Sequence, residues 1–392
     1  MAVQLGVVEP VFTLPPLDDV PDEPEDQPVP GASLSKGELG PIGLPELVFG
    51  AATFSSHYNT EDLLATDVPL RTARLALRYG IRAFDTSPYY GTSEIVLGTV
   101  LKALRPEFPR TSYKLMTKCG RYSPGPQGFD YSPAAIRAGI NRSLERLNTD
   151  YLDVVYLHDV EYVCTRIAAK DSGNHATALR EDKAAYGLQE GDESKVWGEG
   201  DQRILDAIGE LRKLRAEGVI RNIGISGYPL PTLLRLALLV LHTPPFEPLD
   251  IILSYSHLCI QNATYCDFIP HFRDRARIPN ILTASPLSMG MLTPNPPAWH
   301  PAPPPLRLAI KDATEQCAGW EGGLVNISLG YALNRAREIP TVVGLSRLRE
   351  VHENVRVWRE VKENKDGPHR RDLENECVGI FKSAGYLDWD WA

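Results

Sequence analysis

The feature that most constrains this chain is a repeated alternation, from Leu44 onward, of short apolar runs with segments of helical periodicity. Eight runs are predicted to be strands, at residues 47–54, 81–86, 113–118, 152–158, 220–226, 250–257, 280–287 and 341–346. Their apolar residues do not alternate strictly with polar ones, as is typical of parallel strands buried on both faces. Helical patterns such as SPAAIRAGINRSLERL and RILDAIGELRKLRAEG lie between them. This order predicts an α/β fold, a closed (β/α)₈ TIM barrel, ahead of an open doubly wound sheet.

The barrel pattern does not fill the whole chain of 392 residues. Residues 1–40 contain many prolines and acids, including PPLDDVPDEPEDQPVP, and we expect a flexible, disordered leader because such a segment buries little apolar surface. Residues 41–365 are assigned to a single barrel domain and residues 366–392 to a C-terminal extension. The polar residues 161–200 form an insertion after the fourth strand, either functional or simply solvated. The proline-rich residues 294–305 are predicted to form a substrate wall.

Composition narrows the classes of partner. The chain has 41 Lys and Arg against 50 Asp and Glu, a net charge of -9, and no basic block, so we do not expect it to bind nucleic acid. The longest apolar run, near Leu233 to Leu241, contains Arg235, so no membrane-spanning helix is predicted. The first residues lack the pattern of a secretory or mitochondrial signal, and we expect a cytoplasmic protein. Six widely spaced cysteines without a CxxC pair predict free, buried thiols, with neither a disulfide framework nor a metal site.

Four polar residues lie at or just after the ends of the second, third and fourth predicted strands. They are Asp85 and Tyr90 in the segment FDTSPYYG, Lys118 in LMTKCG and His158 in YLHD. Taken singly, each has a structural interpretation: a turn cap, a wall aromatic, a solvated strand end and a histidine at the barrel rim. Taken together they indicate a catalytic centre, because active sites of (β/α)₈ barrels lie at the carboxyl ends of the strands.

The four residue types suit proton transfer. A tyrosine hydroxyl has an ordinary pKa of about 10, and a neighbouring ammonium such as that of Lys118 stabilises its phenolate. Tyr90 is therefore the predicted acid or base. The Asp85 carboxylate is expected to hold Lys118 protonated and in place. His158 is expected to hydrogen-bond the substrate oxygen and share the proton.

The segments FDTSPYYG, the Thr-Lys end of the third strand and YLDVVYLHD resemble the motifs of the aldo-keto reductases, and the similarity extends from about Leu44 to Asn354. The resemblance implies a barrel that binds a nicotinamide cofactor without a Rossmann fold. It also implies hydride transfer between that cofactor and a carbonyl or carbinol carbon, with the four residues as the catalytic tetrad. No strand-linked GxGxxG occurs in the chain, as this expectation requires.

The resemblance also implies where the cofactor is bound. Ser226 matches the serine that binds the carboxamide, although the asparagine that usually follows it is Gly227 here. Ala284 replaces the aromatic residue that normally stacks on the nicotinamide, so Tyr255 is the candidate to support the ring. The remaining candidate cofactor residues are Thr53, Ser285, Leu287, Ser288, Leu345, Arg347, Glu350 and Asn354.

The segment VVGLSRLREVHEN bears on the choice between NAD and NADP. Members of the family that prefer NADP place a lysine and an arginine before the closing asparagine, where this chain has Gly344 and Glu350. A carboxylate repels a 2′-phosphate and accepts hydrogen bonds from free ribose hydroxyls, so NAD is expected and NADP is less favoured. Two readings oppose this: Arg347 is placed to reach a phosphate, and Glu350 also fits a solvated helix face.

The segments LSYSH, ASPLSMGML and NPPAWHPAP are similar to those of the sugar 1-dehydrogenases of this family, the D-arabinose and L-galactose dehydrogenases. The predicted reaction is the NAD-dependent oxidation of an aldose at C1 to its lactone, with Tyr90 as the base, in a monomer or homodimer. Candidate sugar contacts are His57, Tyr58, Tyr89, Trp299 and His300. One alternative is an NADPH-dependent reductase of aldehydes or ketones. A second is a non-catalytic, cofactor-binding regulatory subunit.

Overall fold

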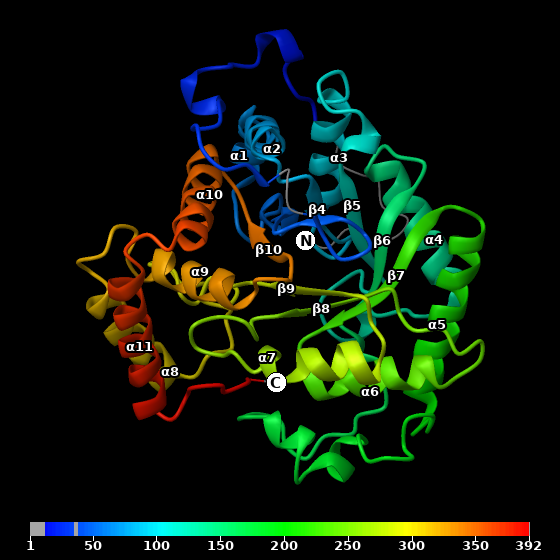
Figure 1. The fold of residues 1–392 in the computed structure, drawn as a ribbon. Helices are drawn as coiled ribbons and strands as arrows, with labels where there is room; N and C mark the ends of the chain where they lie inside the picture. Colours follow the sequence, from blue (N-terminus) through cyan, green and yellow to red (C-terminus); the bar gives the residue numbers. More distant parts are fainter. Residues whose placement is uncertain (1–11, 35–37, 392) are drawn as a thin grey trace.

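The computed structural model describes residues 12–34 and 38–391. Eight parallel strands close into a barrel in the order β10-β3-β4-β5-β6-β7-β8-β9 (Figure 1). Their bounds are β3 Leu47–Gly50, β4 Ala83–Asp85, β5 Lys114–Cys119, β6 Leu152–His158, β7 Ile220–Gly227, β8 Ile251–Tyr255, β9 Asn280–Ala284 and β10 Thr341–Gly344. The predicted barrel is confirmed. A short antiparallel pair, β1 Glu38–Leu39 and β2 Leu44–Pro45, precedes it.

Helices surround the strands, as Figure 1 shows. They are α1 Glu61–Leu64, α2 Val68–Tyr79, α3 Ser93–Ala103, α4 Pro133–Arg146, α5 Glu199–Ala216, α6 Leu230–Leu241, α7 Tyr265–Pro270, α8 Pro304–Gln316, α9 Gly323–Arg335, α10 Leu348–Glu363 and α11 Gly367–Ser383. Local signals set their ends. The side chain of Ser132 caps α4 by accepting a hydrogen bond from the backbone N–H of Ala135, and Pro133 occupies the first turn. Gly80 ends α2 with a φ of 92°, which a glycine adopts without strain.

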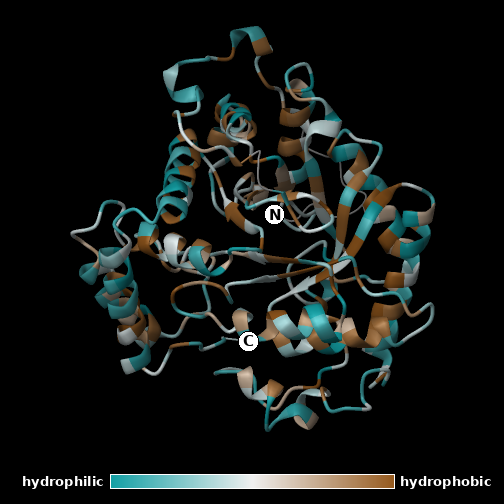
Figure 2. Cartoon of the chain, in the orientation of Figure 1, coloured by the Kyte–Doolittle hydropathy of each residue, from teal (hydrophilic) through white to brown (hydrophobic). Residues whose placement is uncertain are grey.

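Successive residues of the strands face opposite sides and build two layers of core. Val48 and Met116 belong to a cluster formed by inward-facing strand residues, whereas Phe49 and Leu115 join the larger cluster between the strands and the helices. Figure 2 shows the same layering, with hydrophobic strands and helices whose hydrophilic residues face outward. The barrel is therefore packed solid, and a ligand site has to lie at its mouth.

Several predicted strands extended too far at their carboxyl ends. β3 stops at Gly50, and residues 51–53 form a 3₁₀ turn. β8 and β9 end at Tyr255 and Ala284, because Ser256 and Ser285 adopt positive φ angles of 62° and 57° that turn the chain out of the sheet.

The prediction of a disordered leader is wrong for residues 12–34, which pack on α2 and α10. Asp26 is fully buried and accepts hydrogen bonds from Arg71 at 2.7 Å and from Arg74 at 3.3 Å. Arg78, one turn further along α2, binds Asp22 at 2.6 Å. The acidic residues that led to the prediction of disorder therefore pair with three arginines on one face of α2. The composition of the leader alone does not reveal these partners. Residues 1–11 and 35–37 of the predicted leader lie outside the described residues.

The insertion at residues 161–200 is ordered by buried contacts although it contains little regular structure beyond 3₁₀ turns. Arg235 on α6 forms a buried ion pair with Asp201 at 2.7 Å and donates to the carbonyl of Thr165 at 2.9 Å. The C-terminal extension also packs on the barrel domain: α11 lies against α8 and α9, and the tail after it runs toward α7 (Figure 1).

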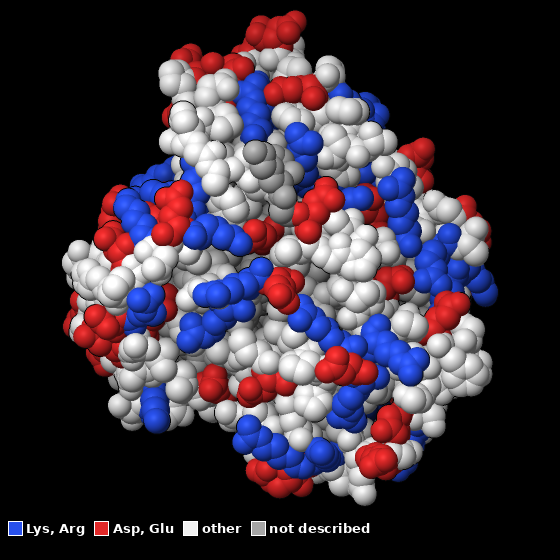
Figure 3. Space-filling view, viewed as in Figure 1, with Lys and Arg blue, Asp and Glu red and all other residues white. Residues whose placement is uncertain are grey.

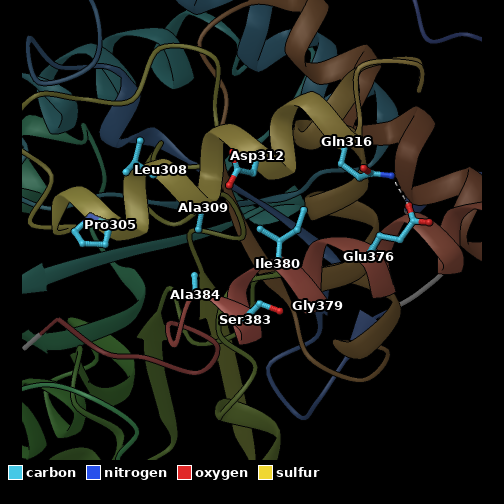
Figure 4. Close-up of a pocket in the computed structure, with 10 residues that line it drawn as sticks. All are labelled: Pro305, Leu308, Ala309, Asp312, Gln316, Glu376, Gly379, Ile380, Ser383 and Ala384. Carbon is cyan, nitrogen blue, oxygen red and sulfur yellow. Dashed lines mark hydrogen bonds between the residues drawn. The ribbon is translucent and has the colours of Figure 1, made fainter.

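The outer surface carries both signs of charge, and Lys and Arg are interspersed with Asp and Glu over the face drawn in Figure 3. None of the described helices is both long and apolar enough to cross a membrane. The six cysteines are free, as predicted, although Cys266 is exposed. Figure 4 shows an open groove of about 710 Å³ between α8 and α11, where Gln316 donates to Glu376 at 2.7 Å. None of the predicted site residues lines this groove.

Candidate active site

The structure brings the four strand-end residues together at the mouth of the barrel. Lys118 Nζ donates to Asp85 Oδ1 at 2.5 Å and to the carbonyl of Thr86 at 3.1 Å. The same ammonium lies 5.0 Å from the centroid of the Tyr90 ring, and the Tyr90 and His158 rings meet edge to face with centroids 5.6 Å apart. One oxyanion or hydroxyl can therefore contact both Tyr90 and His158.

Burial dominates the ionisation of this group. Burial acts to lower the pKa of Lys118, but Asp85 and Tyr90 outweigh it and raise that pKa to about 12. Burial raises the pKa of Tyr90 above its ordinary value, and the attraction of Lys118 offsets only part of the effect. The Lys118 ammonium thus lowers the pKa of Tyr90, as the sequence predicts, but by less than desolvation raises it. Tyr90 retains its proton at neutral pH.

His158 is held as a neutral ring. Burial, followed by the charges of Lys118 and Arg121, lowers its pKa well below the ordinary value. Its Nδ1 is 2.9 Å from Ser87 Oγ, and its carbonyl accepts a hydrogen bond from Tyr131 at 2.7 Å. A neutral histidine can orient a substrate oxygen by hydrogen bonding, but it holds no extra proton to share. Whether His158 also takes part in the proton transfer stays a prediction.

Sequence reasoning missed a charged cluster beside the tetrad. Arg121 forms an ion pair with Asp159 and its guanidinium covers the ring of Tyr89 at 3.7 Å. Asp159 adopts a left-handed conformation with φ 55°, which turns the chain directly after β6. Glu161, two residues further on, accepts a hydrogen bond from the backbone N–H of Tyr228 at 2.9 Å. A usable signal was present, since all three are charged residues next to predicted strand ends.

The residues predicted to bind the nicotinamide lie at the ends of β7 and β8. Ser226 pairs with His158 across the sheet and donates its hydroxyl to the carbonyl of Leu157 at 3.2 Å. The Tyr255 ring is half-buried and lies 5.3 Å from that of Tyr228. A Cβ on Gly227 would lie 2.3 Å from Glu161 Oε2, so Glu161 occupies the space that a side chain at position 227 would fill.

The residues predicted to hold the dinucleotide phosphates follow β9. Ser285, Ser288 and Met289 all have positive φ angles, between 50° and 57°, and form a tight turn. Leu287 is half-buried in this turn, and the buried hydroxyl oxygen of Ser288 has no hydrogen-bond partner. A row of turning backbone amides beside an unpaired hydroxyl suits an anionic ligand.

The adenosine end of the predicted site lies at the start of α10. Thr53 donates its hydroxyl to the carbonyl of Leu345 at 2.8 Å, which ties the first strand's loop to the last strand's loop. Arg347 is exposed at the N-cap position of α10. Asn354 donates to the carbonyl of Glu350 at 2.7 Å, and its buried Oδ1 has no hydrogen-bond partner. A nicotinamide dinucleotide fits these groups. The N-terminus of α10 and the exposed Arg347 suit its phosphates, and the unpaired Asn354 Oδ1 and Ser288 Oγ are free to hydrogen-bond it.

Glu350 has a structural role that the sequence did not reveal. Its Oε2 accepts a hydrogen bond of 2.6 Å from the backbone N–H of Ser346, just before α10. Burial raises the pKa of Glu350, and this hydrogen bond and Arg347 oppose the rise. One carboxylate oxygen is therefore occupied in capping the helix, although the side chain still lies beside Arg347.

The predicted sugar contacts divide into two groups. The His57 and Tyr89 rings are 6.0 Å apart beside the tetrad. Tyr58 and Trp299 meet edge to face at 6.1 Å on the rim, with 44% and 51% of their surfaces exposed. These four residues are accessible to a ligand above the strand ends.

His300 is buried, unlike the other four predicted sugar contacts. Its Nδ1 accepts a hydrogen bond from the backbone N–H of Ala302 at 3.0 Å, and burial lowers its pKa to about 4. Its ring contacts Trp391 edge to face at 4.8 Å, and its Nε2 has no hydrogen-bond partner. His300 therefore links the proline-rich loop to the C-terminal tail, and a contact with substrate stays a prediction.

The C-terminal tail supplies an aromatic ring that sequence reasoning missed. Trp391 stacks on Tyr228 with ring centroids 4.8 Å apart, next to Tyr255 at the end of β8. Asp390 anchors the tail by accepting from Asn262 at 2.6 Å and by pairing with His257 at 2.9 Å. The sequence offered only a cluster of aromatics in YLDWDWA, with no sign that it returns to the barrel mouth.

Comparison with known proteins agrees with this geometry. Residues 46–367 match the model of the Aldo/keto reductase family. The chain belongs to this family. It is 36% identical to L-galactose dehydrogenase of Arabidopsis thaliana over 90% of this chain and 95% of that protein. It is 34% identical to D-arabinose 1-dehydrogenase of Saccharomyces cerevisiae over 88% of this chain and 92% of that protein.

A solved structure of the holo form of an aldo-keto reductase from Bacillus halodurans has the same fold. Its TM-score is 0.57 at 21% identity, over 87% of this chain and 95% of that one. As an aldo-keto reductase, the chain is an oxidoreductase that acts on an alcohol or carbonyl group, and members of this family bind nicotinamide cofactors.

Proposed function

We propose that this protein is an NAD-dependent aldose 1-dehydrogenase that oxidises a D-arabinose-like sugar at C1 to its lactone. The observation that carries the proposal is the cluster of Asp85, Lys118, Tyr90 and His158 beneath an aromatic rim. Two relatives that span most of the chain are named for oxidation of such sugars.

In this proposal the tetrad handles the proton of the anomeric hydroxyl. His158, neutral and fixed by Ser87, orients the hydroxyl by hydrogen bonding. Tyr90 accepts the proton, and Lys118 stabilises the phenolate that has to form first. The bound nicotinamide supplies the hydride acceptor. Ser226 and Tyr255 would hold its ring, and the turn at Ser285 together with the start of α10 would hold its phosphates.

The raised pKa of Tyr90 gives this proposal a pH dependence. Oxidation requires the phenolate, and burial makes the phenolate scarce at neutral pH. We therefore expect the oxidation rate to increase from pH 7 toward pH 10, whereas reduction by the protonated phenol should not increase. Initial rates in the two directions over this range measure the effect.

The aromatic rim supports a sugar as the substrate. Tyr58, Trp299 and Trp391 present ring faces or edges around a mouth whose floor is polar. Flat rings above directed hydrogen-bonding groups suit a pyranose or furanose, which has both an apolar face and hydroxyls.

A panel of aldoses assayed with NAD and with NADP, with trapping of lactone, tests the proposal. We expect lactone from D-arabinose or a sugar of the same C1 to C4 configuration, at higher kcat/KM with NAD. Turnover of simple aldehydes with NADPH alone would contradict it.

Turnover of simple aldehydes with NADPH alone would favour the second candidate function, an NADPH-dependent carbonyl reductase. Two features support this candidate: burial raises the pKa of Tyr90, which favours its role as a proton donor, and Arg347 is exposed at the start of α10, where it is free to bind a phosphate. Nucleotide binding without turnover of any sugar, aldehyde or ketone would instead indicate a regulatory subunit.

A further inference from the structure

Glu161 places an unpaired carboxylate oxygen beside the end of β7. Its Oε1 accepts from Tyr228 N–H at 2.9 Å, but its Oε2 is buried and has no hydrogen-bond partner. A Cβ on Gly227 would lie 2.3 Å from Oε2, so any side chain there would displace the carboxylate. Gly227 directly follows Ser226, which pairs with His158. The unpaired oxygen therefore lies at the edge of the active site.

The surroundings of Glu161 supply little positive charge. Arg121 acts on both Glu161 and Asp159, but its ion pair is with Asp159. Burial, and then the charge of Asp159, raises the pKa of Glu161 to about 8. The other titratable groups that face it have raised pKa values and are uncharged at neutral pH: Tyr131, Tyr162, Cys164 and Tyr255. A buried carboxylate with so little compensation is stabilised by any ligand that brings a cation or an N–H donor.

We propose that Glu161 faces the nicotinamide of the bound cofactor and selects its oxidised, positively charged form. The inference rests on the proposed function, which supplies a nicotinamide next to His158. An oxidised nicotinamide ring carries a positive charge and its amide carries N–H donors, whereas the reduced ring is neutral. A carboxylate at this edge therefore stabilises the oxidised form more than the reduced form.

Gly227 is the second half of this arrangement. It has no side chain, and Glu161 reaches across from the loop after β6 so that its carboxyl group fills the space beside it. With a pKa of about 8, this group becomes negatively charged at alkaline pH or when a bound cation lowers that pKa. The glycine at position 227, where the family usually has asparagine, and the carboxyl group of Glu161 therefore form one structural feature. Such a feature favours an enzyme that binds oxidised cofactor and acts as a dehydrogenase.

The affinities of the full-length protein for NAD⁺ and NADH at pH 9, measured by titration, test this inference. In Glu161→Gln the amide retains the Tyr228 hydrogen bond and the shape of the side chain but lacks the charge. We expect its Kd for NAD⁺ to increase about tenfold while its Kd for NADH changes less than about twofold. Gly227→Ala, which displaces the carboxylate, should shift the ratio of the two constants in the same direction. Glu190→Gln, an exposed change of equal charge in the same insertion, should leave the ratio unchanged.

The same titrations at pH 6.5 provide a second test. Protonation of Glu161 should move the wild-type ratio toward that of Glu161→Gln, and the variant itself should show little dependence on pH. An unchanged ratio in both Glu161→Gln and Gly227→Ala would overturn the role of Glu161. A wild-type protein that binds neither NAD(H) nor NADP(H) would instead contradict the proposed function, so the two failures are distinguishable.

Discussion

The two halves of the barrel mouth are built in different ways. On the β4 to β6 side, Asp85, Lys118 and His158 are held by neighbours on adjacent strands, such as the 2.5 Å contact between Lys118 and Asp85. Next to it, after β7, Trp391 packs on Tyr228 from a position 163 residues further along the chain. The reacting groups therefore depend on contacts within the barrel, and the substrate surface depends on segments brought together from distant parts of the sequence.

This difference predicts different responses to mutation. The β4 to β6 side is buried and polar, so a substitution there removes a charge or hydrogen bond that water cannot replace. The rim is partly exposed, and its aromatic rings contribute contact area with less directional bonding. We expect changes on the first side to lower kcat and changes on the second side mainly to raise KM.

The largest effect is expected for Tyr90→Phe, which removes the hydroxyl that transfers the proton. The rate should decrease by about 10²- to 10⁴-fold. Nucleotide binding, measured by titration, should stay close to that of wild type. Tyr151→Phe removes a hydroxyl from a ring just before β6, at the amino end of the strand, and serves as the control, with a rate within a few-fold of wild type. Full activity of Tyr90→Phe would rule out this residue as the acid or base.

Lys118→Met is expected to reduce both rate and stability. It leaves the buried carboxylate of Asp85 without its cation, which costs about 3 to 5 kcal/mol in the free energy of unfolding. Chemical denaturation and kcat measure the two effects. Adding Asp85→Asn should restore much of the stability but none of the activity. Recovery of activity in the double variant would show that Lys118 has only a structural role.

Trp391→Ala tests the rim side of the comparison. Loss of the ring that stacks on Tyr228 should raise KM for the sugar roughly tenfold and change kcat by less than about threefold. The control is Phe246→Ala, an exposed aromatic residue before β8 at the other end of the barrel, which should change neither constant. A decrease in kcat alone would place Trp391 among the groups that act on the reaction itself.

The smallest effect is expected for Glu350→Gln, because the carboxylate is half-buried and already accepts a hydrogen bond from Ser346, so only part of its charge can act on a bound nucleotide. The amide can still accept the hydrogen bond from Ser346, so the helix cap remains. The Kd for NADP should decrease about two- to fivefold relative to that for NAD. Glu353→Gln on the same helix is the matched control. An unchanged ratio would show that Glu350 acts only as a cap.

Sequence reasoning predicted the barrel and the tetrad because both arise from the register of successive strands. Eight strands alternating with helices favour a closed barrel over an open sheet, and polar residues at the ends of neighbouring strands then lie close together. The same reasoning failed for residues 12–34, since Asp26 is neutralised by Arg71 and Arg74 on a helix distant in sequence. It also gave no sign that His300 is buried and that its ring contacts Trp391 of the C-terminal tail.

By itself the sequence determined the fold and the types of residue that meet at the mouth of the barrel, because local periodicity and strand order fix them. Only the tertiary structure decided that burial outweighs Lys118 in setting the pKa of Tyr90 and that it lowers the pKa of His158, because desolvation depends on everything packed around a group. It also decided that Glu161 fills the space beside Gly227 and that the C-terminal tail reaches the barrel mouth. These contacts join residues far apart in the chain, and no local pattern encodes them.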